Sequence, residues 1–267
     1  MRKVLLFLFT SLLLPNTWQN INSSVPKPMT FDVISSDINT TKIKFEMDGF
    51  HLIPSDDSKA ITFKVKSENG ASILNKGYPD LHNFSKSIII PDKSKTSVNI
   101  LSYKYEDYED IFVTPSKGNI SREINPKDIP IQYNDIYKTN EFYPSEISEL
   151  SNPYVLRDLR GQTISVNPFQ YNAVTKTLRV YTEVVLEVVS SGVSSQNTVE
   201  RLGDSVKLSS NYDEIYKEHF INYSNDTRFQ YLIDQGNMLI VSNDAFLTTM
   251  EPFVDWKNKK GIPTEMV

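Results

Sequence analysis

Short runs of alternating apolar and polar residues recur from Phe31 to about Val189, broken by Asp, Asn, Gly and Pro. Alternation with period two directs one side of a run into a core and the other toward water, which is typical of β-strands. The predicted strands cover residues 42–47, 60–65, 87–90, 97–101, 111–113, 163–166 and 178–188. No helical pattern separates them. We therefore predict a mainly β domain, an antiparallel β-sandwich.

The last predicted strand shows the alternation most clearly. Leu178, Val180, Val184, Leu186 and Val188 share one face, whereas the opposite face carries Arg179, Glu183 and Glu187. This segregation indicates a long antiparallel strand with one solvated face.

The pattern changes after this strand. Gly, Ser and Asn are frequent in residues 190–198, which predicts a linker that we extend to residue 210. Aromatic and aliphatic residues then recur at helical spacing, which predicts a helix over residues 211–223.

The C-terminal residues 229–267 have a third pattern. An apolar run from Met238 to Val241 is followed by a helical pattern from Phe246 to Lys257, and a second strand begins at Thr264. The order strand, helix, strand predicts the opening of a parallel α/β domain. One βαβ unit cannot cover both faces of its sheet, so we interpret this segment as the truncated start of a second domain.

The N-terminus indicates export. Arg2 and Lys3 precede a mostly apolar run that ends at Pro15, which is typical of a secretory signal peptide, and we place this peptide at residues 1–24. The run is shorter than the ~20 apolar residues of a transmembrane helix, so no stable membrane span is expected. We expect passage through the periplasm, followed by secretion or display on the cell surface.

Charge and residue usage exclude several functions. A net charge of -5 argues against a nucleic-acid-binding surface. The chain has no cysteine, and therefore neither a thiol nucleophile nor a disulfide. His51, His82 and His219 lack metal-ligand spacing, so we expect no metal site and no cofactor.

Two long strings resemble the propeptides of gingipains, the secreted cysteine endopeptidases of Bacteroidetes. They are FYPSEISELSNPYVLRDLRGQ from Phe142 and PFQYNAVTKTLRVYTEVVLEV from Pro168. The segment from Pro115 to Arg122 resembles the same family, as does DEIYKEHFINY from Asp213. The string MLIVSNDAFLTTMEPFVDWKNKKGIPTE from Met238 looks like the first strand and helix of the gingipain catalytic domain.

The resemblance implies a propeptide over residues 25–228 that acts as an intramolecular inhibitor and folding aid. Its partner would be the peptidase domain of its own precursor, and residues 229–267 would begin that domain, which is caspase-like. The catalytic Cys and His of the family would lie beyond Val267. The precursor would therefore be a cysteine endopeptidase, whereas this chain alone is expected to be inactive.

The resemblance also assigns roles to three residues. Arg122 stands where arginine-specific members place an inhibitory arginine in their own S1 pocket, and Arg228 stands at the cleavage junction, with Phe229 as the first mature residue. A guanidinium binds a carboxylate through a bidentate fork that lysine cannot copy. The string Arg157-Asp158-Leu159-Arg160-Gly161 is interpreted as a structural ion-pair network at a strand end.

One alternative comes from a different class. The chain could be a stand-alone exported β-sandwich that binds glycan or another cell-surface partner, a function that requires an exposed aromatic or apolar patch. The 14 tyrosines and 14 phenylalanines fall mostly at alternating or helical positions. We therefore assign most of them to core packing.

Overall fold

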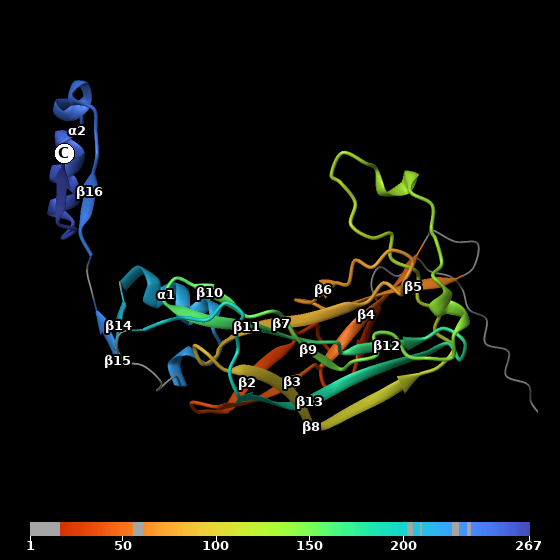
Figure 1. The fold of residues 1–267 in the computed structure, drawn as a ribbon. Helices are drawn as coiled ribbons and strands as arrows, with labels where there is room; N and C mark the ends of the chain where they lie inside the picture. The colour runs from red at the N-terminus through yellow and green to blue at the C-terminus, as the bar shows by residue number, and fades with distance from the viewer. Residues whose placement is uncertain (1–16, 56–60, 202–204, 209, 226–229, 234–235) are drawn as a thin grey trace, which may run out of the picture.

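The structure is a computed structural model that describes residues 17–55, 61–201, 205–208, 210–225, 230–233 and 236–267. Its main body, called the sandwich below, consists of antiparallel sheets (Figure 1) that enclose the larger of two apolar clusters among the described residues. The first sheet contains β2 (Thr30–Ser36), β3 (Thr40–Glu46), β8 (Lys95–Tyr108), β12 (Phe169–Asn172) and β13 (Thr177–Ser191). The second contains β6 (Ala71–Ser72), β7 (His82–Ile89), β9 (Ser148–Leu150), β10 (Tyr154–Leu156) and β11 (Leu159–Val166). A three-stranded sheet adds β1 (Thr17–Asn20), β4 (Gly49–Ser55) and β5 (Thr62–Lys66). The smaller cluster packs α1 (Ser210–His219) and the chain after it against β7 and β11.

Strand β13 is the centre of the first sheet. It pairs with β8 along its length, and its other edge pairs with β12 and then with β3. The apolar face predicted for this strand is buried in the core, while Glu183 and Glu187 point outward and lie 3.4 Å from Lys44 and Lys42, respectively. The structure thus confirms the predicted long antiparallel strand with one solvated face.

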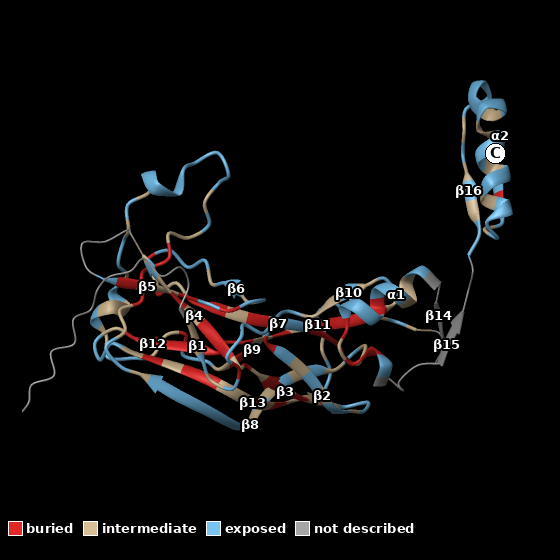
Figure 2. Ribbon diagram, turned by 180° about the vertical axis from the view of Figure 1, so that it is seen from behind, coloured by how far each residue is buried: buried red, intermediate tan, exposed pale blue. Residues whose placement is uncertain are grey.

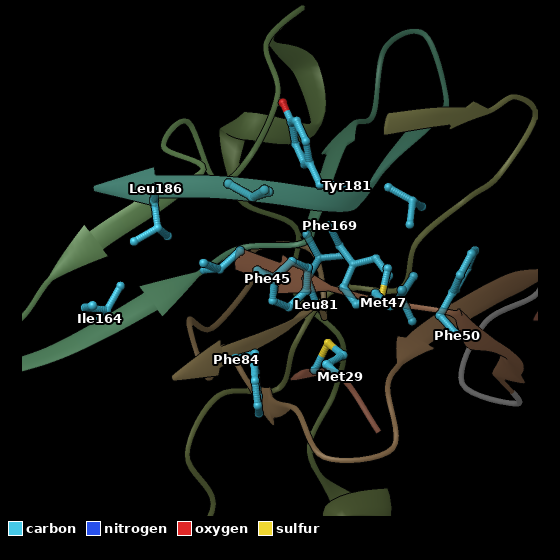
Figure 3. Packing of buried hydrophobic residues seen from close by; sticks show 14 of the residues in the cluster. Met29, Phe45, Met47, Phe50, Leu81, Phe84, Ile164, Phe169, Tyr181 and Leu186 are labelled. Atoms are coloured by element: carbon cyan, nitrogen blue, oxygen red, sulfur yellow. The ribbon is translucent and has the colours of Figure 1, made fainter. Parts of the chain in front are cut away.

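Aromatic and aliphatic side chains from all three sheets fill the core. Figure 3 shows Phe45 of β3, Phe84 of β7 and Phe169 of β12 directed into the same region. The ring centroids of Phe31 and Phe45 are 5.7 Å apart, with the rings in an edge-to-face arrangement that aromatic pairs prefer. Core packing therefore accounts for these aromatic residues, as the sequence predicted.

Two strands differ from their predictions. Residues 111–113 do not form a strand, because Val113 makes only an isolated bridge to Phe63. Conversely, β8 continues to Tyr108, well past the predicted end at residue 101. The apolar pattern fades over this part of β8, which is mostly exposed, but pairing with β13 supplies the backbone hydrogen bonds that keep it extended.

The segment predicted as a linker is instead held against the sandwich. Arg160, fully buried in β11, donates from Nε to the carbonyl oxygen of Asn197 at 2.9 Å and from Nη2 to that of Gln196 at 3.0 Å. Its Nη1 donates to the carbonyl oxygens of Pro91 at 2.7 Å and Ser94 at 2.8 Å. One guanidinium thus joins the loop at residues 91–94 to the segment at residues 196–197 by donating to four carbonyl oxygens. Asp158 pairs with its neighbour Arg157 at 3.3 Å, so the predicted network at this strand end is only partly ionic.

The predicted helix forms as α1 (Ser210–His219), but it ends before residue 223. The chain then runs beside β7, where Phe220 bridges Ser87 and the backbone N–H of Ile221 donates to the Ser87 carbonyl at 3.0 Å. Asn222 is fully buried and contacts both backbone groups of Ile89, at 2.8 Å and 3.1 Å. A short 3-10 helix, η3 (Tyr223–Asn225), follows. The pairing with β7 explains why the helix stops.

The C-terminal unit, residues 236–267, has the predicted βαβ order. Strands β16 (Met238–Ile240) and β17 (Thr264–Met266) pair in parallel. The 3-10 helix η4 (Asp244–Phe246) and then α2 (Leu247–Lys259) connect them. A second parallel pair joins β14 (Ser205–Leu208) to β15 (Gln230–Ile233). Figure 2 colours most of the C-terminal unit as exposed, and Figure 1 shows it standing apart from the sandwich. No helix among the described residues is long and apolar enough to span a membrane.

Candidate functional site: the Arg122 loop

A loop of residues 117–133, called the Arg122 loop below, projects from one end of the sandwich (Figure 1). One glycine fixes both of its ends. The N–H of Gly77 donates to the carbonyl of Ser116, and the carbonyl of Gly77 accepts from the N–H of Asn134, both at 2.9 Å. Gly77 has a φ of +84°, where a β-carbon is strained, and that carbon would lie 3.2 Å from the Asn134 nitrogen. The base of the loop is therefore closed by backbone geometry that requires glycine.

Aromatic packing supports the outgoing arm of the loop. The ring of Tyr133 meets that of Tyr137 edge-on at a centroid distance of 5.0 Å, and the Tyr137 hydroxyl donates to the Val113 carbonyl at 2.9 Å. Burial strongly raises the pKa of Tyr137. The phenol therefore remains protonated at neutral pH and keeps its hydrogen bond to the sandwich. The 3-10 helix η2 (Asp135–Lys138) begins directly after the loop and carries this tyrosine.

Beyond its base, the Arg122 loop is held by its own turns. The N–H of Ile124 donates to the Ser121 carbonyl at 3.0 Å, which closes a turn that contains Arg122. The 3-10 helix η1 (Pro126–Asp128) follows, and it has no buried residue. Lys117 extends across the loop and donates to the Pro126 carbonyl at 2.9 Å. The loop thus has a defined shape, while residues 121–128 at its tip are exposed to solvent.

Arg122 lies exposed on this turn. Its guanidinium has no hydrogen bond or ion pair with any other residue that the structure describes. A free guanidinium offers five N–H donors in one plane, which match a carboxylate in a complementary pocket. The arrangement is thus suited to presenting one arginine side chain to a partner.

The other sequence-predicted site residues, Arg228 and Phe229, lie outside the described residues, so the structure gives no geometry for them. Within the described ranges, no cluster of His, Asp or Glu side chains could hold a metal ion. Sequence reasoning missed the role of Gly77. The signal available was the Asn75-Lys76-Gly77 string, in which Asn and Gly indicate a turn, although no local pattern reveals that both ends of a distant loop meet there.

Comparisons with known proteins agree with one another. The family model described as Propeptide_C25 matches residues 25–227. Gingipain R2 of Porphyromonas gingivalis is 36% identical over 236 residues, which cover 88% of this chain and 32% of that protein. Lys-gingipain HG66 of the same organism is 25% identical over 270 residues, which cover 98% of this chain and 16% of that protein. The chain therefore spans about a third or less of the length of these relatives.

A solved structure gives the same result. It is described as the complex of Porphyromonas gingivalis RgpB pro- and mature domains, and one of its chains is 36% identical to this chain with a TM-score of 0.66. The match covers 73% of this chain and 97% of that chain. The mainly β, antiparallel fold is thus shared with a protease pro-domain.

Proposed function

Because the chain belongs to the Propeptide_C25 family and carries a gingipain propeptide, we propose that its sandwich inhibits the peptidase domain of its own precursor and assists the folding of that domain. The inhibitory element is the Arg122 loop. Its arginine enters the S1 pocket of the peptidase as a substrate side chain would, and the fixed loop base holds it there.

The exposed, unpaired guanidinium on a loop closed at Gly77 is the observation that carries this proposal. A loop that is shaped before it meets its partner loses little conformational entropy on binding. An S1 pocket selective for arginine needs a carboxylate at its base, and Arg122 supplies the matching fork. The higher identity to gingipain R2 than to Lys-gingipain HG66 favours arginine over lysine specificity.

The proposal extends to the remainder of the chain. Residues 229–267 begin the peptidase domain, and their βαβ order supports this assignment. Cleavage between Arg228 and Phe229 releases the mature enzyme. The precursor leaves the cytoplasm through its signal peptide and is then secreted or retained at the cell surface. Mass spectrometry of the exported precursor tests the junction, and a bond 228–229 that stays intact in active enzyme contradicts it.

The inhibition is tested with the 267-residue chain added to an arginine-specific gingipain-type peptidase. We expect the unaltered chain to inhibit and Arg122→Ala to weaken inhibition at least about 30-fold, because truncating one partner of a desolvated charge pair costs ~2–5 kcal/mol. Arg122→Lys should restore only part of the effect, since an ammonium cannot form the fork.

Lys127→Ala is the matched control, because it removes a different exposed cation from the same loop. It should leave inhibition nearly unchanged. Equal inhibition by the unaltered chain and by Arg122→Ala contradicts the role of Arg122. Glycan binding without any inhibition would instead favour the alternative of a stand-alone binding module.

A further inference from the structure

The guanidinium groups of the other sandwich arginines have more contacts than that of Arg122. The structure describes four others, and each one has its guanidinium engaged by neighbouring groups: Arg157, Arg160, Arg179 and Arg201. Several lysines, by contrast, are exposed at turns and loops, among them Lys76, Lys127 and Lys176.

Arg160 and Arg179 lie inside strands. The guanidinium of Arg160 is fully buried and donates hydrogen bonds to four backbone carbonyls. Arg179 forms a bidentate pair with Asp107, with both nitrogen–oxygen distances at 2.8 Å. The same guanidinium lies 4.1 Å from the ring centre of Tyr105 and 4.5 Å from that of Phe142. Both arginines are therefore held through their side chains and through sheet hydrogen bonds.

Arg157 occupies the tight turn between β10 and β11, where its φ is +50°. Its guanidinium lies 4.2 Å from the ring centre of Tyr212 and 3.3 Å from the Asp158 carboxylate. The Arg157 side chain is exposed, but the pairing of β10 with β11 on both sides keeps this turn closed.

Arg201 belongs to the segment held against the sandwich. Its guanidinium forms a bidentate pair with Asp92, at 2.5 Å and 3.1 Å, and also donates to the Asp158 carbonyl. The nearby N–H of Val199 donates to the Asp92 carbonyl at 3.2 Å. Both the side chain and the adjacent backbone are thus engaged.

A peptidase specific for arginine must insert that side chain into its S1 pocket and bind the flanking backbone in an extended form. Native proteins are cut where a segment can open locally at low free-energy cost, which favours exposed loops over paired strands. Arg122 meets this requirement because its turn lies in an exposed loop that no sheet holds. Arg160, Arg179 and Arg201 do not, and Arg157, although exposed, lies in a tight turn between paired strands.

We propose that the propeptide protects Arg157, Arg160, Arg179 and Arg201, called the framework arginines below, from arginine-specific peptidases, so that the sandwich stays intact beside the enzyme with which it is made. This inference rests on the proposed function for the identity of that enzyme. Arg179 and Arg201 form bidentate pairs and Arg160 binds four carbonyls, contacts that lysine cannot replace, and these contacts also keep the three side chains from an S1 pocket. Among the described arginines, Arg122 alone combines an exposed, unpaired guanidinium with a loop outside the sheets.

The test is limited proteolysis of the folded 267-residue chain by an arginine-specific endopeptidase, with fragments identified by mass spectrometry. The enzyme is an arginine-specific endopeptidase of an unrelated family, which the Arg122 loop is not proposed to inhibit, and cuts after Arg122 are expected early. Cuts after the four framework arginines should be at least 100-fold slower than in the urea-unfolded chain. Cuts after Arg228 are not counted, because it lies outside the described residues.

Three variants test whether the surroundings of an arginine decide if it is cut. Lys127→Arg places an arginine in the exposed loop and should create a new cut within tenfold of the rate at Arg122. Lys44→Arg places one in β3, beside Glu46 and Glu183, and should create none. Asp92→Ala removes the carboxylate that binds Arg201 and should accelerate the cut after Arg201 at least tenfold.

Rapid cutting of the folded chain after any framework arginine overturns the inference, as does rapid cutting of the Lys44→Arg chain at residue 44. These outcomes leave inhibition by Arg122 untouched, because that is measured in a separate assay. Conversely, the unaltered chain could fail to inhibit while its framework arginines resist proteolysis. That result would refute the proposed function and would leave the protection of these arginines established.

Discussion

The sandwich and the C-terminal unit differ in how far they bury their apolar side chains. In the sandwich, Phe45, Ile43 and Leu186 are fully buried. In the C-terminal unit, Leu239 is 62% exposed, Val241 78% and Trp256 48%. Figure 2 shows the same contrast along the chain. One region covers its own core, and the other leaves apolar side chains in solvent.

The difference follows from sheet type. An antiparallel sheet can keep one face in water, so the sandwich is satisfied by a single core. A parallel pair with one helix leaves a face uncovered, and isolated two-stranded sheets are marginal in water. The sandwich therefore buries its own core, whereas the C-terminal unit leaves much of its apolar surface exposed.

The largest expected effect compares one phenylalanine from each region. Phe45→Ala should lower the free energy of unfolding of the sandwich by ~3–5 kcal/mol, because it opens a cavity in a fully packed core. Phe253→Ala, on the half-exposed surface of α2, should change it by less than ~0.5 kcal/mol. Urea unfolding followed by near-ultraviolet circular dichroism measures both. Equal losses would mean that the two regions unfold as one body and would remove the contrast.

A smaller effect comes from a buried histidine of the sandwich. Burial, and then the nearby charge of Lys66, lowers the pKa of His82 from 6.5 to about 4. Its Nδ1 accepts a hydrogen bond from the Ser67 N–H at 3.2 Å, so the neutral ring is the favoured form. Since the unfolded chain binds the proton more tightly, stability is complete above pH 6.5 and is lost as the pH falls toward 4. The loss attributable to His82 approaches ~3 kcal/mol.

His82→Asn retains an acceptor for Ser67 but cannot be protonated. The difference in unfolding free energy between the unaltered chain and this variant should therefore shrink or reverse between pH 6.5 and pH 4. Asp80, whose pKa is raised by burial, is common to both proteins and cancels in the difference. A difference that stays constant across this window would show that His82 is not the group that titrates.

The smallest effect tests whether α1 belongs to the sandwich. Asn222→Leu leaves the N–H and carbonyl of Ile89 without their partner and should cost ~2 kcal/mol. Hydrogen exchange in α1 should accelerate together with exchange in β7. Ile215→Ala, on the exposed side of α1, is the control and should change little. If α1 exchanges rapidly in both proteins, it belongs with the less stable region instead.

Local patterns predicted much of this molecule but not its long-range polar contacts. The alternation of β13 and the order of the C-terminal unit were readable because each depends on neighbouring residues. The carbonyl contacts of Arg160 and the double contact of Gly77 were not, because their partners lie far away in sequence. The exposed end of β8 was not predicted for a similar reason, since pairing with β13 keeps it extended although its own sequence lacks the apolar alternation of a strand. The role of Arg122 came from resemblance alone.

The anchoring of Asn222 also fixes the length of a tether. From this buried residue to Gly236, where the C-terminal unit begins, the chain can reach at most about 50 Å. Whatever is attached after this stretch is held near the sandwich at an effective concentration on the order of millimolar. The sandwich can thus stay bound to an attached domain even if its intrinsic affinity for that domain is modest. A cut anywhere in the tether makes the same encounter bimolecular, so that dilution alone lowers occupancy.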